Sequence, residues 1–175
     1  MRLTLRLAIV MLLAFFRRRN SSIFEESILQ LRVMPWDCVW RFMGNDRYYS
    51  FMDLGRIDFV LRMGWGKAIL KNKWNPFVIG SYIQYRAPLK MFQLVELHTK
   101  LIYWDSRFFW MEHEFKRKEK TIALAISKSA ATYNSRVVST SLIFWIVVGN
   151  PEKPPCPDKV ERMKDVETIL SMNSN

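Results

Sequence analysis

The sequence is poor in the residues that build disulfide frameworks, metal clusters and phosphate loops. Its 175 residues include two cysteines, two histidines and six dispersed glycines. Cys38 and Cys156 are far apart and belong to no CxxC motif or Cys/His cluster, so we expect a reducing compartment. Neither a glycine-rich phosphate loop nor a G-x-S-x-G elbow is present, which argues against nucleotide-loop and serine-hydrolase chemistry. We therefore expect neither a metal nor a cofactor.

Long apolar runs are also missing. The longest run begins at Leu7 and ends at Phe16, which is ten residues, whereas a spanning helix needs about 20. Three arginines follow it (Arg17, Arg18 and Arg19), not the small residues of a signal-peptide cleavage site. Two interpretations stay open: residues 3–16 form a helix that packs on the domain, or an interfacial helix whose arginines contact anionic head groups. Both predict a cytoplasmic protein, peripheral at a membrane in the second case.

Positive charge is abundant, with a formal net charge of +11. It is concentrated within residues 1–19 and in the expected turn at 116–120, and elsewhere it alternates with acidic residues. Because no RNP-like, zinc-finger or helix-turn-helix signature accompanies it, we do not expect a nucleic-acid partner. An anionic membrane surface, reached through residues 1–19, or an anionic ligand explains the charge better.

The remaining composition is that of one globular domain, because half of the residues are hydrophobic and 14% are aromatic. We divide the chain into an apolar and basic segment (1–19), a domain (20–150), and a proline-rich link with a surface helix (151–175). Apolar spacing predicts a strand at 28–33, a loop at 34–45 and one long helix at 46–63. Four segments rich in aromatic and β-branched residues follow with short connections, at 77–86, 92–104, 108–115 and 121–133. This order predicts an α+β fold in which an antiparallel sheet wraps around one long helix.

The long helix has recognisable ends and an apolar stripe. Asn45 or Asp46 is the expected N-cap, and Gly64 closes the helix. Gly55 lies on the apolar stripe, where the missing side chain would let a strand approach closely. Asp58, four residues before an arginine, is expected on the exposed side.

Three stretches carry a resemblance. They are RVMPWDCVWRFMGNDRYYSFMDLGRIDFVLRMG (32–64), APLKMFQLVELHTKLIYWDSRFFWMEHEF (87–115) and the apolar N-terminal segment that runs into residue 30. Together they resemble the thioesterase-like branch of the hotdog superfamily, related to acyl-CoA thioesterases of the 4-hydroxybenzoyl-CoA type. The resemblance implies a hotdog fold and an acyl-CoA or acyl-carrier thioester as ligand. It also implies a homodimer or higher homo-oligomer, because family sites combine one subunit's central helix with its partner's loops.

The chain departs from the family at the positions of its catalytic groups. The family's D-x-D pair keeps its first acid at Asp37, but Val39 stands where the second acid serves as base or nucleophile. The family's H-M-N-N motif is replaced by Phe42-Met43-Gly44-Asn45, without the histidine and one residue shorter. Valine can neither activate water nor attack a carbonyl. The shorter loop leaves open a shift of Asp37 or Asp46 into the vacant position.

The resemblance assigns the remaining site residues. If the protein is an enzyme, Asp37 is the acid-base group, and Asn45 with the backbone near Gly44 polarises the carbonyl. The expected ligand-binding residues are Met43, Gly44, Tyr48, Tyr49 and Met52.

Three functions remain open at this point: an acyl-thioester hydrolase, a non-catalytic descendant that binds acyl-CoA or only keeps the dimer scaffold, and a peripheral membrane protein. Val39 and the missing histidine favour the second over the first. Among other groups, Cys38 is interpreted as an inert buried thiol rather than a nucleophile. His98 and His113 are expected on different strands and are not expected to bind a metal.

Overall fold

The computed structural model describes residues 2–16 and 22–172. Within them the helices are α1 (Arg2–Phe16), α2 (Asn45–Arg62), α3 (Gly66–Lys71), α4 (Thr140–Val147) and α5 (Asp158–Met172), with one 3-10 turn, η1 (Pro35–Asp37). The strands are β1 (Ser27–Arg32), β2 (Cys38–Val39), β3 (Phe42–Met43), β4 (Asn75–Tyr85), β5 (Leu94–Trp104), β6 (Phe109–Arg117), β7 (Lys120–Tyr133) and β8 (Arg136–Val137).

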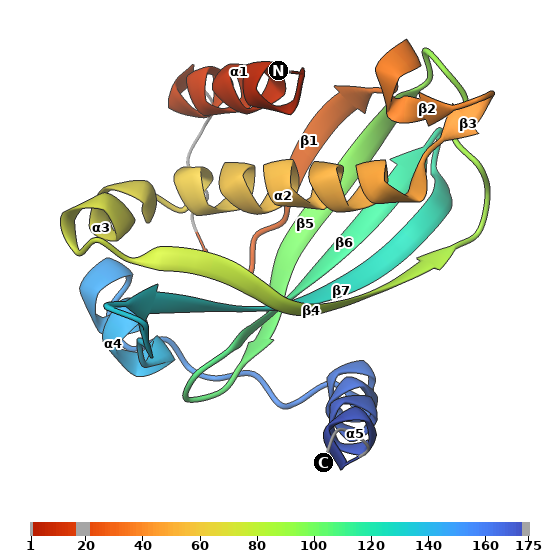
Figure 1. Cartoon of the computed structure of the whole chain (residues 1–175). Helices are drawn as coiled ribbons and strands as arrows, with labels where there is room; N and C mark the ends of the chain where they lie inside the picture. Colours follow the sequence, from red (N-terminus) through yellow and green to blue (C-terminus); the bar gives the residue numbers. More distant parts are fainter. Residues whose placement is uncertain (1, 17–21, 173–175) are drawn as a thin grey trace.

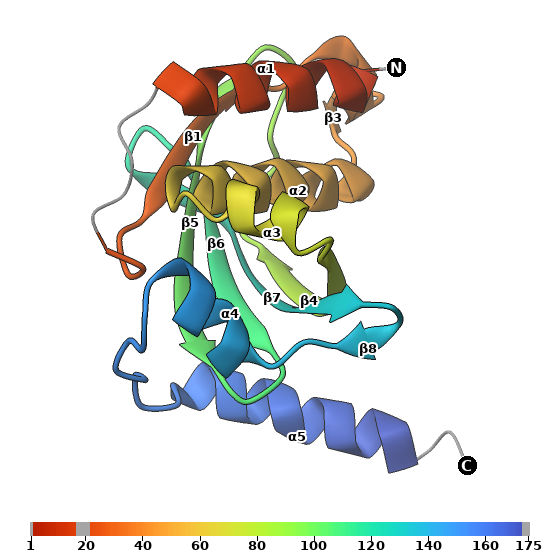
Figure 2. The same cartoon turned by 90° about the vertical axis from the view of Figure 1, so that its left-hand side faces the viewer.

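The main sheet is antiparallel throughout, in the order β1-β5-β6-β7-β4, with β8 added to β7. It curls around α2, which lies across its concave face, while α1 lies over α2 and α5 covers the opposite face of the sheet (Figures 1 and 2). The long helix and the antiparallel sheet that encloses it confirm the predicted hotdog fold. Hairpin connections of a few residues join β5 to β6 and β6 to β7, as the sequence predicted.

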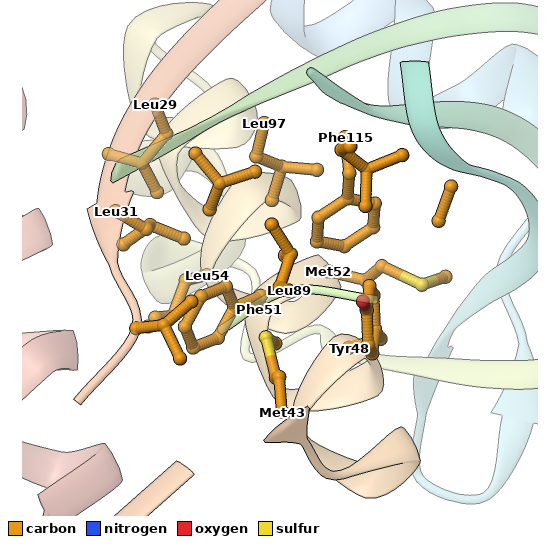
Figure 3. Packing of buried hydrophobic residues seen from close by; sticks show 14 of the residues in the cluster. Leu29, Leu31, Met43, Tyr48, Phe51, Met52, Leu54, Leu89, Leu97 and Phe115 are labelled. Atoms are coloured by element: carbon orange, nitrogen blue, oxygen red, sulfur yellow. The ribbon is translucent and has the colours of Figure 1, made fainter. Parts of the chain in front are cut away.

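The centre of α2 is buried because the sheet approaches its backbone at Gly55. A Cβ atom at Gly55 would lie 2.6 Å from Thr99 Oγ1 and 2.7 Å from Leu97 Cδ2, both on β5. On either side of this contact Phe51 and Phe59 are almost fully buried. Figure 3 shows the resulting packing of α2 side chains against the sheet. The prediction that a glycine permits close approach here is confirmed.

Two expectations about α2 are wrong. Its N-cap is Gly44, not Asn45 or Asp46, because Gly44 has the extended backbone of a cap and donates its N–H to the Asp37 carbonyl at 2.9 Å. Asp58 is fully buried and accepts a hydrogen bond from Ser27 Oγ on β1. The helical period alone predicted that this side of α2 faces solvent, whereas β1 packs against it through Ser27.

The N-terminal segment forms a helix, as predicted, and packs on α2. Val10 is 3% exposed in this contact, while the outer side of α1 leaves large apolar side chains in solvent: Leu5, Ile9, Met11, Leu12 and Leu13. The arginines predicted to contact head groups, at 17–19, lie outside the described residues. No helix in the described part of the chain combines the length and apolar character needed to cross a membrane.

Two short helices were not predicted. α3 follows α2 directly, and α4 contributes Phe144 to a second cluster of buried side chains with Trp65, Trp104 and Phe109. The helix predicted near the C-terminus is confirmed as α5.

Candidate functional site

The loop that carries the D-x-D remnant is built at the N-terminal end of α2. Within the predicted loop at 34–45, the structure forms η1 and the small β2–β3 hairpin, with Cys38 opposite Met43 and Val39 opposite Phe42. The hairpin turns at Trp40, whose φ is 62°. The Met43 N–H donates to the Leu89 carbonyl at 2.8 Å and fixes the hairpin to the segment before β5. The loop is therefore held against the domain.

Asp37 anchors this loop. Its side chain is 4% exposed, and its Oδ2 accepts hydrogen bonds from Arg6 Nη2 at 2.6 Å and from the Met34 N–H at 2.8 Å. Arg6, on α1, also donates to the Arg32 carbonyl at 2.9 Å, and its guanidinium lies 4.9 Å from the centre of the Phe51 ring. Charge-assisted bonds of this kind are among the strongest that side chains form. The carboxylate is thus committed to a structural network that joins α1 to the loop.

Val39 and Asp46 both lie close to Gly44, at the start of α2. A Cβ atom at Gly44 would lie 2.6 Å from Asp46 Oδ1 and 3.2 Å from Val39 Cγ2, so both side chains approach the same point. Val39 is 73% exposed, and the Asp46 side chain is 68% exposed and ion-paired with Arg47 Nε at 3.3 Å. A helix N-terminus carries partial positive charge, which favours a carboxylate or a developing oxyanion. Asp46 is therefore the accessible carboxylate next to the position that Val39 occupies.

The expected ligand-binding residues separate into two groups. Met43, Tyr48 and Met52 are buried in the core beneath the loop (Figure 3). The Tyr48 ring makes edge contacts with the rings of Tyr85 and Phe115. Burial raises the pKa of Tyr48 to about 12, so its phenol is neutral at physiological pH.

Asn45 and Tyr49 form the second group, on the exposed side of the first turns of α2, while Gly44, the N-cap, is buried. Asn45 is exposed as the first residue of the helix, and Tyr49 is 42% exposed. The structure thus leaves Asn45 and Tyr49 exposed on the first turns of α2, the helix that also carries Asp46, and buries the methionines in the core.

Cys38 sits in this loop without activation. Burial and the neighbouring Asp37 charge raise the pKa of its thiol, and the thiol form is the less nucleophilic one. This supports the interpretation of Cys38 as an inert thiol.

The sequence did not predict a row of buried, hydrogen-bonded polar side chains beneath α2, formed by Thr99, His113 and Ser127. The ring of His113, on β6, is fully buried between Thr99 Oγ1 (3.2 Å from Nδ1) and Ser127 Oγ (2.9 Å from Nε2). Burial, and then the charge of Arg56 on α2, lowers the pKa of His113 well below its ordinary value. The two-residue period already placed His113 on the same face as Phe109 and Phe115, which was the signal for its burial. Within residues 2–16 and 22–172, no three His, Cys, Asp or Glu side chains gather as metal ligands would.

A long helix enclosed by an antiparallel sheet, with the Asp37–Gly44 loop at the helix N-terminus, defines a protein of the hotdog fold. The chain belongs to the thioesterase-like superfamily, whose model matches residues 33–162. Protein THEM6 of Drosophila melanogaster is 28% identical over 120 residues, which cover 67% of this chain and 62% of that protein. Protein THEM6 of Xenopus laevis is 29% identical over 112 residues, or 63% of this chain and 54% of that protein. The chain therefore spans little more than half the length of these relatives.

The fold is also that of solved thioesterases. The 4-hydroxybenzoyl CoA thioesterase from Pseudomonas sp. strain CBS-3 superposes with a TM-score of 0.64 at 12% identity, over 70% of this chain and 98% of that one. At this identity the similarity establishes the fold and no more.

Proposed function

We propose that the chain binds acyl thioesters, as acyl-CoA or acyl-carrier esters, at the N-terminal end of α2, and that it hydrolyses them weakly or not at all. Membership of the thioesterase-like superfamily supports a hydrolase-like ligand site. One observation carries the loss of rate: Val39 is 73% exposed at the site loop, where the family has its second acid. The first acid, Asp37, is held by Arg6 and the Met34 N–H.

Residual hydrolysis needs a base that can reach the thioester. A carboxylate takes a proton from water, which adds to the carbonyl. The intermediate then breaks the C–S bond, and the carboxyl group returns the proton to the leaving thiolate, so that the free acid and the thiol are released. Asp46 is the better-placed carboxylate, since it is exposed and lies beside Val39, and Asp37 is the alternative that the resemblance names. Asn45 and the first N–H groups of α2 supply the donors that polarise the carbonyl.

The proposed site lies beside an unpaired sheet edge. The sheet ends at β4, whose eleven residues (NPFVIGSYIQY) include no charged side chain. Tyr85 is the last residue of β4. Burial, and to a lesser extent the neighbouring phenol of Tyr49 on α2, raises the pKa of Tyr85. A homodimer formed through β4 would close this side of the site. Such a dimer would let a partner subunit contribute to ligand binding, as the resemblance implies.

Release of free thiol from a panel of acyl-CoA esters tests the proposal. The wild-type chain should give little or no turnover, and Val39→Asp should raise the rate, while Val39→Asn, of the same shape without the charge, should not. Asp46→Asn and Asp37→Asn identify the base of any residual activity. Robust wild-type turnover that survives both Asn substitutions would contradict the assignment.

Binding of a non-hydrolysable acyl-CoA analogue separates the two non-catalytic alternatives. Saturable binding without turnover supports an acyl-CoA-binding descendant. Absence of both leaves the dimer scaffold as the retained function.

A second candidate function is peripheral attachment to an anionic membrane through α1. The observation that favours it is the outer side of α1, where Leu5 is 64% and Leu12 is 61% exposed. Co-sedimentation with vesicles that contain anionic lipid should be lost in Leu5→Ser/Leu12→Ser. Equal co-sedimentation of this variant and the wild type would exclude α1 as the attachment.

A further inference from the structure

Helix α5 crosses the outer face of the sheet and reaches its open edge. Val160, near the start of α5, is fully buried in a cluster with Tyr103 of β5 and Trp110 of β6. Further along, Glu167 is ion-paired with Lys128 of β7. A Cβ atom at Gly80 of β4 would lie 3.5 Å from Glu167 Oε1, which places this part of the helix over the edge strand. Figure 2 shows the same course from β5 toward β4.

The last turn of α5 continues past β4. At a rise of 1.5 Å per residue, residues 168–172 extend about 7 Å beyond Glu167, and a strand added to a sheet lies about 4.8 Å from its neighbour. The end of α5 therefore overhangs the position that the first strand of a continued sheet would take.

The overhang is apolar. Val166, Ile169, Leu170 and Met172 are 54%, 59%, 65% and 72% exposed. Beneath it on β4, Tyr82 is 62% exposed on the same outer face, because it pairs with Ile126, a member of the cluster that holds Val160. Residues 166–172 carry a single charged side chain, Glu167, and its charge is matched by Lys128.

A second copy of this chain is the occupant that fits. An antiparallel edge strand pairs with itself about a two-fold axis, and β4 has none of the charged side chains that protect exposed edges. Each copy carries a formal net charge of +11, so two copies can approach closely only through a surface free of unmatched charge. The surface formed by β4 and residues 166–172 of α5 meets that condition.

We propose that α5 is a clasp between two copies of the chain: when the β4 strands pair, residues 166–172 of each α5 cross the joint and bury their apolar side chains against β4 and α5 of the other copy. This inference rests on the proposed homodimer and adds the surface that stabilises it. By the two-fold symmetry, the two clasps cross the same joint in opposite directions.

Sedimentation equilibrium of the full chain over a dilution series tests the clasp. Val166→Ser/Ile169→Ser should weaken dimerisation by about tenfold or more. Its thermal unfolding midpoint, measured at a dilution at which both proteins are monomeric, should equal that of the wild type, because both side chains are exposed in a single copy. Leu142→Ser/Trp145→Ser, which removes exposed apolar side chains from α4, is the matched control and should dimerise like the wild type. Ile79→Lys, which places a charge on the β4 edge, should abolish the dimer.

The outcomes separate the clasp from the proposed function. If the α5 variant dimerises as tightly as the wild type while Ile79→Lys does not, the clasp is wrong and the β4 dimer stands. If the wild type is monomeric at about 100 μM, both the dimer and the clasp are overturned. If the α5 variant keeps its dimer but loses co-sedimentation with anionic vesicles, the apolar overhang belongs to a membrane and the clasp is again wrong.

Discussion

The two faces of the sheet are covered by helices that are held in different ways. On the inner face, α2 contributes aromatic and aliphatic side chains to a continuous core, and its closest approach is made at Gly55, where a side chain is missing. On the outer face, α5 buries Val160 and packs Met163 against the same cluster, and two ion pairs add to this contact: Lys159 with Glu112 and Glu167 with Lys128. Lys128 and Lys164 also lie over the Trp110 ring.

The difference predicts that the packing of α2 and the packing of α5 on the sheet depend differently on salt. Apolar burial is insensitive to salt and contributes roughly 25 cal/mol per Å², whereas partly exposed ion pairs contribute about 0–1 kcal/mol each and are screened by salt. Burial alone would raise the pKa of Glu112, but hydrogen bonds from Lys159 and Lys100 outweigh it and hold the pKa below its ordinary value. We therefore expect α2 to unfold only with the domain and α5 to respond to ionic conditions.

The largest expected effect is on the inner face. Phe59→Ala should lower the free energy of unfolding by about 3–5 kcal/mol, because the ring is 1% exposed and leaves a cavity under α2. Denaturant unfolding measures the loss. Phe92→Ala, which removes a ring that is 57% exposed, is the control and should stay close to the wild type. Similar losses for the two variants would contradict the assigned core.

Arg6→Ala should have the next largest effect, because it leaves the buried Asp37 carboxylate without its ion-pair partner. Removing one member of a buried pair costs about 3 kcal/mol or more, and thermal or denaturant unfolding at neutral pH measures it. Arg6→Ala/Asp37→Asn should be more stable than Arg6→Ala alone, since an asparagine oxygen can still accept from the Met34 N–H. A double variant no more stable than Arg6→Ala would show that the contact is not electrostatic.

The row of buried polar side chains beneath α2 (Thr99, His113 and Ser127) should make the free energy of unfolding depend on pH. The pKa of His113 is lowered in the folded state by burial and by Arg56, so the unfolded chain takes up the proton first as pH falls below about 6.5. The free energy of unfolding should then decrease on acidification, by at most about 1.4 kcal/mol per pH unit. His113→Asn should flatten this slope between pH 6.5 and 5. A slope that is unchanged in the variant would assign the dependence to other groups.

The smallest effect is expected on the outer face. Glu167→Gln should lower the free energy of unfolding by no more than about 1 kcal/mol. Raising the salt concentration from about 0.05 to 1 M should remove the difference between this variant and the wild type. A loss that persists at high salt would show that α5 is held by burial, like α2.

Much of this architecture could be predicted from periodicity alone. The 3.6-residue spacing through Tyr48, Phe51, Met52 and Phe59 predicted α2 to within a residue at each end, and Gly55 marked the approach of the sheet. The two-residue spacing of β6 puts His113 on the same face as Phe109, Met111 and Phe115. These patterns suffice because the apolar face of a helix or strand must be buried whatever its neighbours are.

The candidate site depended on contacts between distant residues, which no local pattern encodes. The resemblance placed Val39 where the family has an acid, left a shift of Asp37 or Asp46 open, and named Asp37 as the acid-base group. The tertiary structure distinguishes them: α1 brings Arg6 to Asp37, which is 31 positions away, and removes that carboxylate from solvent, while Asp46 stays exposed beside Val39. Asp58 was misplaced for the same reason, since its partner Ser27 comes from β1. The sequence by itself determined which segments become helix and strand, because that choice follows from spacing along the chain. Only the tertiary structure decided which carboxylates are neutralised and which face the solvent, because burial and ion pairing depend on which distant segments meet.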